Sequence, residues 1–142
     1  MKRRNFLLAL WIMSPLVFSS CKKDELPSTS TIITGKVIDE NDKPVEGFVL
    51  QFGGYFQKGT SSIPTFDLDD KTNKDGTYKI SYLVKTSDKQ TYFKPIGDYS
   101  NNLFSQYDIY VWKDNKYQFV GNPVGPIIYG QINIFNFKIR KR

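Results

Sequence analysis

Residues 72–84 read TNKDGTYKISYLV, and this stretch decides the fold class. Its Asn-Lys-Asp-Gly segment is typical of a turn, because Asn, Asp and Gly tolerate the backbone angles that tight turns need. Tyr78, Ile80 and Tyr82 then alternate with polar residues, which is the period of a strand with one buried face. The stretch therefore predicts a turn followed by a β-strand at residues 77–84.

Short apolar runs of the same kind recur from residue 31 onward, separated by Gly, Pro, Asn and Asp, and none has helical spacing. Strands are expected at residues 31–38, 45–52, 63–68, 77–84, 106–112, 117–120 and 127–140. Residues 53–76 read as a long polar connection around the third of these, and residues 85–105 read as a loop. The pattern predicts an all-β fold, a single antiparallel β-sandwich over residues 31–142.

The last of these strands changes phase within its length. Ile132 and Ile134 share one face, whereas Phe137 and Ile139 share the other. One extra residue near 134–135 would bring both pairs to the same face, so the pattern predicts a β-bulge there.

The chain has 142 residues, of which 39% are hydrophobic, and it contains no histidine and one cysteine. Its apolar content is sufficient for a buried core. A Ser-His-Asp or Cys-His catalytic unit, a structural zinc site and an internal disulfide are excluded, because the residues they need are missing.

The net charge of +6 comes from the two ends of the chain, since residues 21–137 are nearly neutral. A nucleic-acid partner needs a basic face on the folded body, so none is expected. The basic residues at 138–142 are interpreted as a solvated end that discourages edge pairing. Contact with phosphate groups of a membrane surface is the alternative.

The first 20 residues have the layout of a secretory signal peptide. Residues 1–5 are basic, residues 6–18 (FLLALWIMSPLVF) are mostly apolar, and two serines precede Cys21. The apolar run is shorter than the roughly 20 residues that a spanning helix needs, so we expect a cleaved signal at 1–20.

Residues 18–21 (Phe-Ser-Ser-Cys) resemble the lipobox of bacterial lipoproteins, although Phe18 replaces the usual leucine. The resemblance implies cleavage before Cys21 and acylation, for example with palmitate, of its thiol and its new amino group. Two or more acyl chains would make a stable membrane anchor. The alternative is an ordinary signal peptide followed by a chance cysteine.

Lys22, Lys23, Asp24 and Glu25 resemble the export signal of Bacteroidetes surface lipoproteins. That resemblance implies an outer-membrane location, facing the cell exterior. The alternative is a charged, solvated tether. In either case residues 21–30 are expected to form a lipidated N-terminus and tether that precede the sandwich.

Three segments together resemble the carboxypeptidase regulatory-like domain, a transthyretin-like (prealbumin-like) β-sandwich. The segments are ITGKVID at 33–39, KPVEG at 43–47 and TNKDGTYKI at 72–80. Gly35 and Gly47 are expected to allow close backbone packing, and Gly76 to supply a turn conformation. The resemblance implies a non-catalytic docking or assembly module. The connection at 53–71 is longer than is usual in that family.

Acidic residues gather at 67–75 and raise two chemical alternatives. Oxygen-rich clusters can hold calcium, but the calcium-loop template would put Lys71 and Tyr82 at positions that need carboxylates. A pair among Asp67, Asp69 and Asp70 could serve glycoside hydrolysis. The favoured interpretation is a solvated acidic loop with no metal, no cofactor and no catalytic residues.

Residues 106–112 offer a candidate binding face. Asp108, Tyr110 and Trp112 share one face of this expected strand, opposite the face that should enter the core. Sugar rings could stack on the aromatic pair while their hydroxyls meet Asp108. The alternative is ordinary cross-strand packing. A Lys-Asp-Asn-Lys sequence at 113–116 predicts a tight hairpin turn directly after the strand.

These observations favour a surface-anchored lipoprotein that is not an enzyme. Its expected role is a binding or assembly module of an outer-membrane complex, held in the membrane by its N-terminal lipid. A protein partner there would contact the connections at 53–76 and 85–105. A glycan-binding accessory lipoprotein of a polysaccharide-uptake system is the first alternative, and a small acid-dyad hydrolase is the second.

Overall fold

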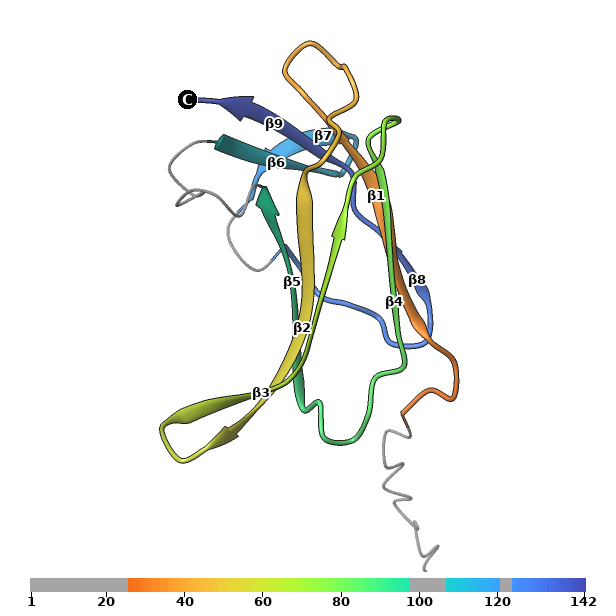
Figure 1. The fold of residues 1–142 in the computed structure, drawn as a ribbon, viewed down its shortest axis with the longest axis vertical. Helices are drawn as coiled ribbons and strands as arrows, with labels where there is room; N and C mark the ends of the chain where they lie inside the picture. Colours follow the sequence, from red (N-terminus) through yellow and green to blue (C-terminus); the bar gives the residue numbers. More distant parts are fainter. Residues whose placement is uncertain (1–25, 98–106, 121–123) are drawn as a thin grey trace, which may run out of the picture.

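The computed structural model describes residues 26–97, 107–120 and 124–142. All regular secondary structure in these ranges is β-strand, arranged in two sheets that face each other (Figure 1). The prediction of an all-β sandwich is confirmed. The predicted signal peptide at 1–20, the lipid site Cys21 and the export signal at 22–25 lie outside the described residues.

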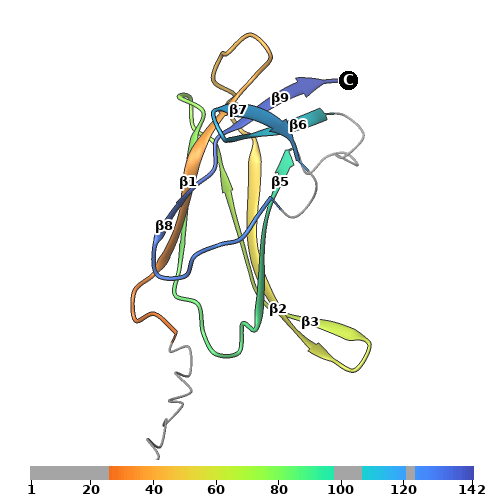
Figure 2. The same cartoon turned by 180° about the vertical axis from the view of Figure 1, so that it is seen from behind.

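The strands form one larger and one smaller sheet. In chain order they are β1 Thr31–Ile38, β2 Val49–Lys58, β3 Ser61–Lys71, β4 Thr77–Tyr82, β5 Gln90–Gly97, β6 Tyr107–Lys113, β7 Lys116–Phe119, β8 Ile132–Ile134 and β9 Phe137–Lys141. The larger sheet has the order β4-β1-β9-β6-β7, with β8 also paired to β1, and the smaller sheet has the order β3-β2-β5. Paired strands are antiparallel, except that β1 runs parallel to β8 and β9 (Figure 2).

The core lies between the two sheets and is rich in aromatic rings. Phe93 of β5 stacks on Tyr78 and Phe135, with ring centroids 6.0 and 5.3 Å away. The centroid of the Phe137 ring lies 6.1 Å from that of Phe93. The core has the apolar inner faces that the strand pattern requires. Among the described residues no helix is both long and apolar enough to cross a bilayer.

The prediction of a long polar connection at 53–76 is wrong in part, because most of these residues form a β-hairpin, and its second strand contains the strand predicted at 63–68. β2 continues through Gly53 and Gly54 to Lys58, and β3 pairs back along it. A side chain at either glycine would collide with the Tyr92 or Phe66 ring. The two glycines therefore leave room for aromatic rings from neighbouring strands rather than ending the strand.

The loop expected at 85–105 is also wrong in part, because it contains β5. This strand carries Pro95, which cannot donate a ladder hydrogen bond. β5 lies at an edge of the smaller sheet and pairs with β2 alone, so one side of its backbone needs no donor.

The prediction of a β-bulge near 134–135 is wrong. The final strand is interrupted between β8 and β9, but Ile32 pairs with Ile132 and Val37 pairs with Phe137. The offset along β1 is the same on both sides of the interruption, so no residue is inserted.

Asn133 explains the change of phase in β8. Its side chain takes the inward position and is buried, while Ile132 and Ile134 point outward. The Asn133 amide accepts a hydrogen bond from Ile128 N (2.8 Å) and donates to Ile128 O (2.9 Å) and Gln131 O (3.1 Å). A buried amide with partners on the preceding loop thus replaces the expected apolar residue.

Candidate functional site

The β6–β7 hairpin presents an aromatic outer surface. Its turn forms as expected, because Asp114 and Asn115 adopt left-handed φ angles of 53° and 59°. This turn sets the register in which Trp112 lies opposite Tyr117. Val111 points into the core, so Trp112 points outward.

Two cross-strand aromatic pairs occupy this surface. The Trp112 and Tyr117 rings meet edge to face, with centroids 4.9 Å apart, and Tyr110 meets Phe119 at 5.8 Å. Trp112 is 46% exposed and Phe119 is 64% exposed. The structure thus places Tyr110 and Trp112 on one outer face and adds two rings from β7 to them.

A pocket of ≈ 420 Å³ opens beside Trp112. We call it the Trp112 pocket, and its lining residues are Lys36, Ile38, Asp42, Trp112, Tyr117 and Asn136. They come from the end of β1, the loop after it, the β6–β7 hairpin and the link between β8 and β9. The pocket therefore forms where strands that are far apart in the sequence meet.

Polar contacts fix the rim of the Trp112 pocket. The Asn136 side-chain oxygen accepts a hydrogen bond from the backbone N–H of Lys36 at 3.0 Å. Lys138 Nζ forms an ion pair with Asp42 at 2.7 Å and lies 5.1 Å from the centre of the Tyr117 ring. The rim thus offers amide, carboxylate and ammonium groups beside two aromatic rings.

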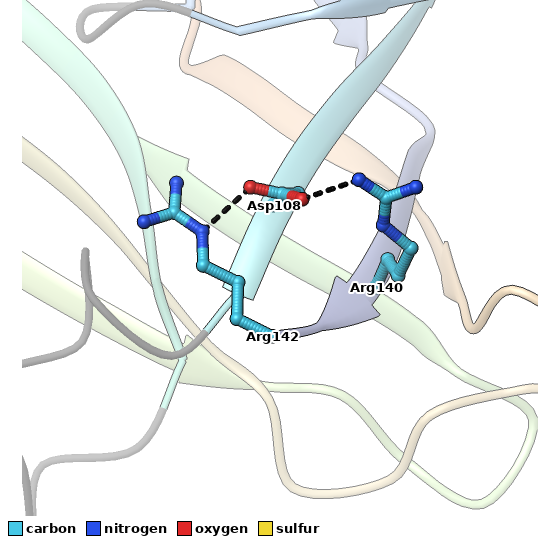
Figure 3. A network of polar contacts seen from close by, with 3 residues as sticks. All are labelled: Asp108, Arg140 and Arg142. Carbon is cyan, nitrogen blue, oxygen red and sulfur yellow. Dashed lines mark hydrogen bonds and ion pairs between the residues drawn. The ribbon is translucent and has the colours of Figure 1, made fainter.

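Asp108 does not line this pocket. Its carboxylate accepts hydrogen bonds from Arg140 Nη2 at 2.6 Å and Arg142 Nε at 2.7 Å (Figure 3). The hydrogen bonds from Arg140 and then Arg142 hold the pKa of Asp108 below its ordinary value. Contact between Asp108 and sugar hydroxyls beside the Tyr110–Trp112 strip stays a prediction, in which the sugar would share the carboxylate with both arginines.

The basic residues at 138–142 were expected to be solvated or, alternatively, to contact phosphate groups of a membrane. Three of them instead form ion pairs with acidic side chains of the same chain. Arg140 and Arg142 pair with Asp108, and Lys138 pairs with Asp42. The ion pairs fasten the last strand to β6 and to the loop after β1.

The acidic residues of β3 do not gather into a cation site. Asp67 accepts a hydrogen bond from Gln51 Nε2 at 3.0 Å, and Asp70 accepts one from the backbone N–H of Lys79 at 2.8 Å. Strand alternation puts Asp70 on the other face from Asp67 and Asp69. No group of three or more metal-ligating His, Cys, Asp or Glu side chains occurs among the described residues.

Of the three acids in the hydrolase alternative, Asp67 and Asp69 lie on the same face of β3. Burial raises the pKa of Asp67, the nearby Asp69 charge raises it further, and Lys94 opposes both effects. The pair lies on β3 in the smaller sheet, on different elements from those of the Trp112 pocket.

No family model and no curated protein matches the chain. Among solved structures it is similar to the crystal structure of the major plantain pollen allergen Pla l 1, with a TM-score of 0.42 and 12% identity over 80% of this chain and 95% of that chain. It is also similar to a 9R-lipoxygenase from Cyanothece PCC8801, with a TM-score of 0.35 and 18% identity over 84% of this chain and 18% of that chain. Neither likeness is close enough to bear on function.

Proposed function

We propose that this chain is a lipid-anchored, non-catalytic binding module of an outer-membrane complex and that its ligand contacts the Trp112 pocket. The observation that carries the proposal is the pairing of exposed Trp112 with half-buried Tyr117 in the lining of a pocket with a polar rim. Aromatic side chains surrounded by polar groups are typical of protein recognition sites.

The anchor is supported by the sequence. A signal-like segment ends in Phe-Ser-Ser-Cys, and Cys21 is the single cysteine of the chain. The acidic and basic residues at 22–25 support delivery to the cell exterior. Membership of the carboxypeptidase regulatory-like family is part of the same proposal, supported by the three glycine-containing segments.

Glycan binding is the second candidate, and the mixture of residues that lines the pocket favours it. A sugar ring presents one apolar face and several hydroxyls, and the pocket combines the Trp112 and Tyr117 rings with the Asp42 and Asn136 side chains. A few side chains of this mixed kind, presented by two strands and by the segments that connect strands, are enough to orient a small polar ligand.

We expect Trp112→Ala to weaken ligand contact by about 10-fold, which corresponds to about 1.4 kcal/mol. Protein contact is measured with a photo-reactive phenylalanine analogue in place of Tyr117, cross-linked in intact cells. Glycan contact is measured by titrating the purified mature chain with a panel of oligosaccharides. Trp112 is the sole tryptophan after residue 20, so its fluorescence follows binding to the unaltered mature chain and to Phe119→Ala. Isothermal titration calorimetry measures binding to Trp112→Ala, which has no tryptophan after residue 20.

Phe119→Ala is the matched control, because this ring is exposed on the same hairpin but does not line the pocket. A discrete cross-linked protein that disappears with Trp112→Ala supports the assembly role. A saturable response to one oligosaccharide class supports the glycan role. If neither readout depends on Trp112, the proposed site is wrong.

The anchor has its own test. Mass spectrometry of the chain from cell envelopes is expected to find a mature N-terminus at Cys21 that carries acyl groups. With Cys21→Ser the chain is expected in the membrane-free fraction. An unmodified thiol on envelope-bound protein would contradict the proposed anchor.

A further inference from the structure

Exposed apolar side chains gather at the end of the sandwich where β1 begins. Leu83, Ile128 and Ile132 are 45%, 58% and 65% exposed. Leu83 directly follows β4, whose last residue Tyr82 pairs with Thr31. Ile132 pairs with Ile32, and Ile128 is hydrogen-bonded to the residue after Ile132. In Figures 1 and 2 the loops after β4 and before β8 lie at this same end.

The charges at this end are basic. Lys85 and Lys89 are exposed on the loop after β4, whereas Asp88 of that loop is buried. Asp88 accepts hydrogen bonds from the backbone N–H of Lys85 at 2.8 Å and from the Tyr82 hydroxyl at 3.1 Å. Burial would raise the pKa of Asp88, but the sum of the hydrogen bonds to its carboxylate outweighs burial and lowers the pKa. The loop thus turns its acid inward and its lysines outward.

The chain also enters the sandwich at this end. Leu26 packs against the core, and the Thr29 hydroxyl donates a hydrogen bond to Gly130 O at 3.1 Å. Part of the tether expected at 21–30 is therefore held on the sandwich. Residues 22–25 alone separate Cys21 from Leu26, and this stretch spans at most about 17 Å even when fully extended.

We propose that this end of the sandwich, which we call the tether end, lies directly on the bilayer surface. Leu83, Ile128 and Ile132 enter the boundary between headgroups and acyl chains, and Lys85 and Lys89 contact anionic headgroups. The proposal rests on the proposed lipid at Cys21, because so short a connection holds the tether end within reach of the headgroups.

The orientation has a consequence for the Trp112 pocket. β1 starts at the tether end with Thr31 and finishes at the pocket with Ile38, roughly 23 Å further along the strand. Docking of the tether end would therefore point the pocket away from the membrane, where a partner can reach it.

The test places a single tryptophan at the tether end of the full lipidated chain. In a Trp112→Phe background, Ile132→Trp is compared with Asn41→Trp, whose loop lies at the opposite end of β1 (Figure 1). The probe is a vesicle of phosphatidylcholine and phosphatidylglycerol with brominated acyl chains. Fluorescence of Ile132→Trp is expected to fall by roughly half or more, and that of Asn41→Trp is expected to stay unchanged.

A second arm separates this inference from the proposed anchor. Chain expressed without residues 1–20 is coupled through Cys21 to a maleimide-bearing lipid in the same vesicles, which supplies the connection whether or not cells acylate the cysteine. Ile128→Trp repeats the measurement should Ile132→Trp disturb folding. Quenching of Ile132→Trp and Ile128→Trp in the coupled chain would support the docking surface. If mass spectrometry also found a non-acylated Cys21 in cells, the anchor alone would be contradicted. Equal, weak quenching at the tether end and at Asn41→Trp would overturn the docking surface.

Discussion

Phe93→Ala is expected to lower the free energy of unfolding by about 3–5 kcal/mol, a large part of the stability of a domain this size. The Phe93 side chain is fully buried and contacts the Tyr78, Phe135 and Phe137 rings, which belong to the opposite sheet or its connections. Truncation would leave a cavity at the point where the two sheets meet. Urea denaturation followed by circular dichroism measures the change.

Phe119→Ala is the control for this change, because the same atoms are removed from a ring that is largely exposed. It is expected to alter the free energy of unfolding by about 0.5 kcal/mol or less. If the two variants were equally stable, Phe93 would not be buried in the core, and the position of β5 in the smaller sheet would be wrong.

The sequence predicts strands well where alternation is intact and turns carry their own signal. β1 has the expected bounds, and the turn at Asp114 and Asn115 forms with the expected backbone. Both are local features, in which neighbouring residues decide the conformation.

The missed strand β5 and the strand β3, which was predicted too short, depend on position in the sheet. β5 contains Pro95, which suggests a loop when the sequence is considered alone, and β3 extends on both sides of the strand predicted at 63–68 although it contains Pro64. Both strands are edges of the smaller sheet, where a residue without an N–H is tolerated. Whether a strand lies at an edge depends on the order of strands in the sheet, and the local pattern of residues does not predict that order.

The residues of the candidate site also fall into those that the local sequence could predict and those that depend on strand order. Tyr117 could have been predicted, because a two-residue turn after Lys113 places it opposite Trp112. Lys36 and Asn136 could not, since their place beside Trp112 follows from β9 lying between β1 and β6. The engagement of Asp108 by Arg140 likewise depends on that order.

Gly35→Ala is expected to cost about 4 kcal/mol or more, the range reserved for severe steric conflict in a core. A Cβ at Gly35 would overlap the Phe135 carbonyl oxygen and lie 2.7 Å from its carbon. That carbonyl accepts a hydrogen bond from the Tyr78 hydroxyl at 2.7 Å, while Phe135 N donates to Thr34 O at 2.9 Å. Because both contacts hold Phe135 against β1, its backbone has little freedom to move away.

Gly59→Ala separates this steric cost from the ordinary cost of replacing a glycine. Gly59 has a left-handed φ of 63° in the β2–β3 turn, and a Cβ there would meet nothing within 4 Å. Its replacement is expected to cost about 1–2 kcal/mol, the penalty of that backbone conformation for an L-residue. Thermal and urea unfolding of both variants decide the point. If Gly35→Ala lowered the free energy of unfolding no more than Gly59→Ala, the residues between β8 and β9 would be free to shift along β1. The close approach of Phe135 to Gly35 would then not be what positions Asn136 in the Trp112 pocket.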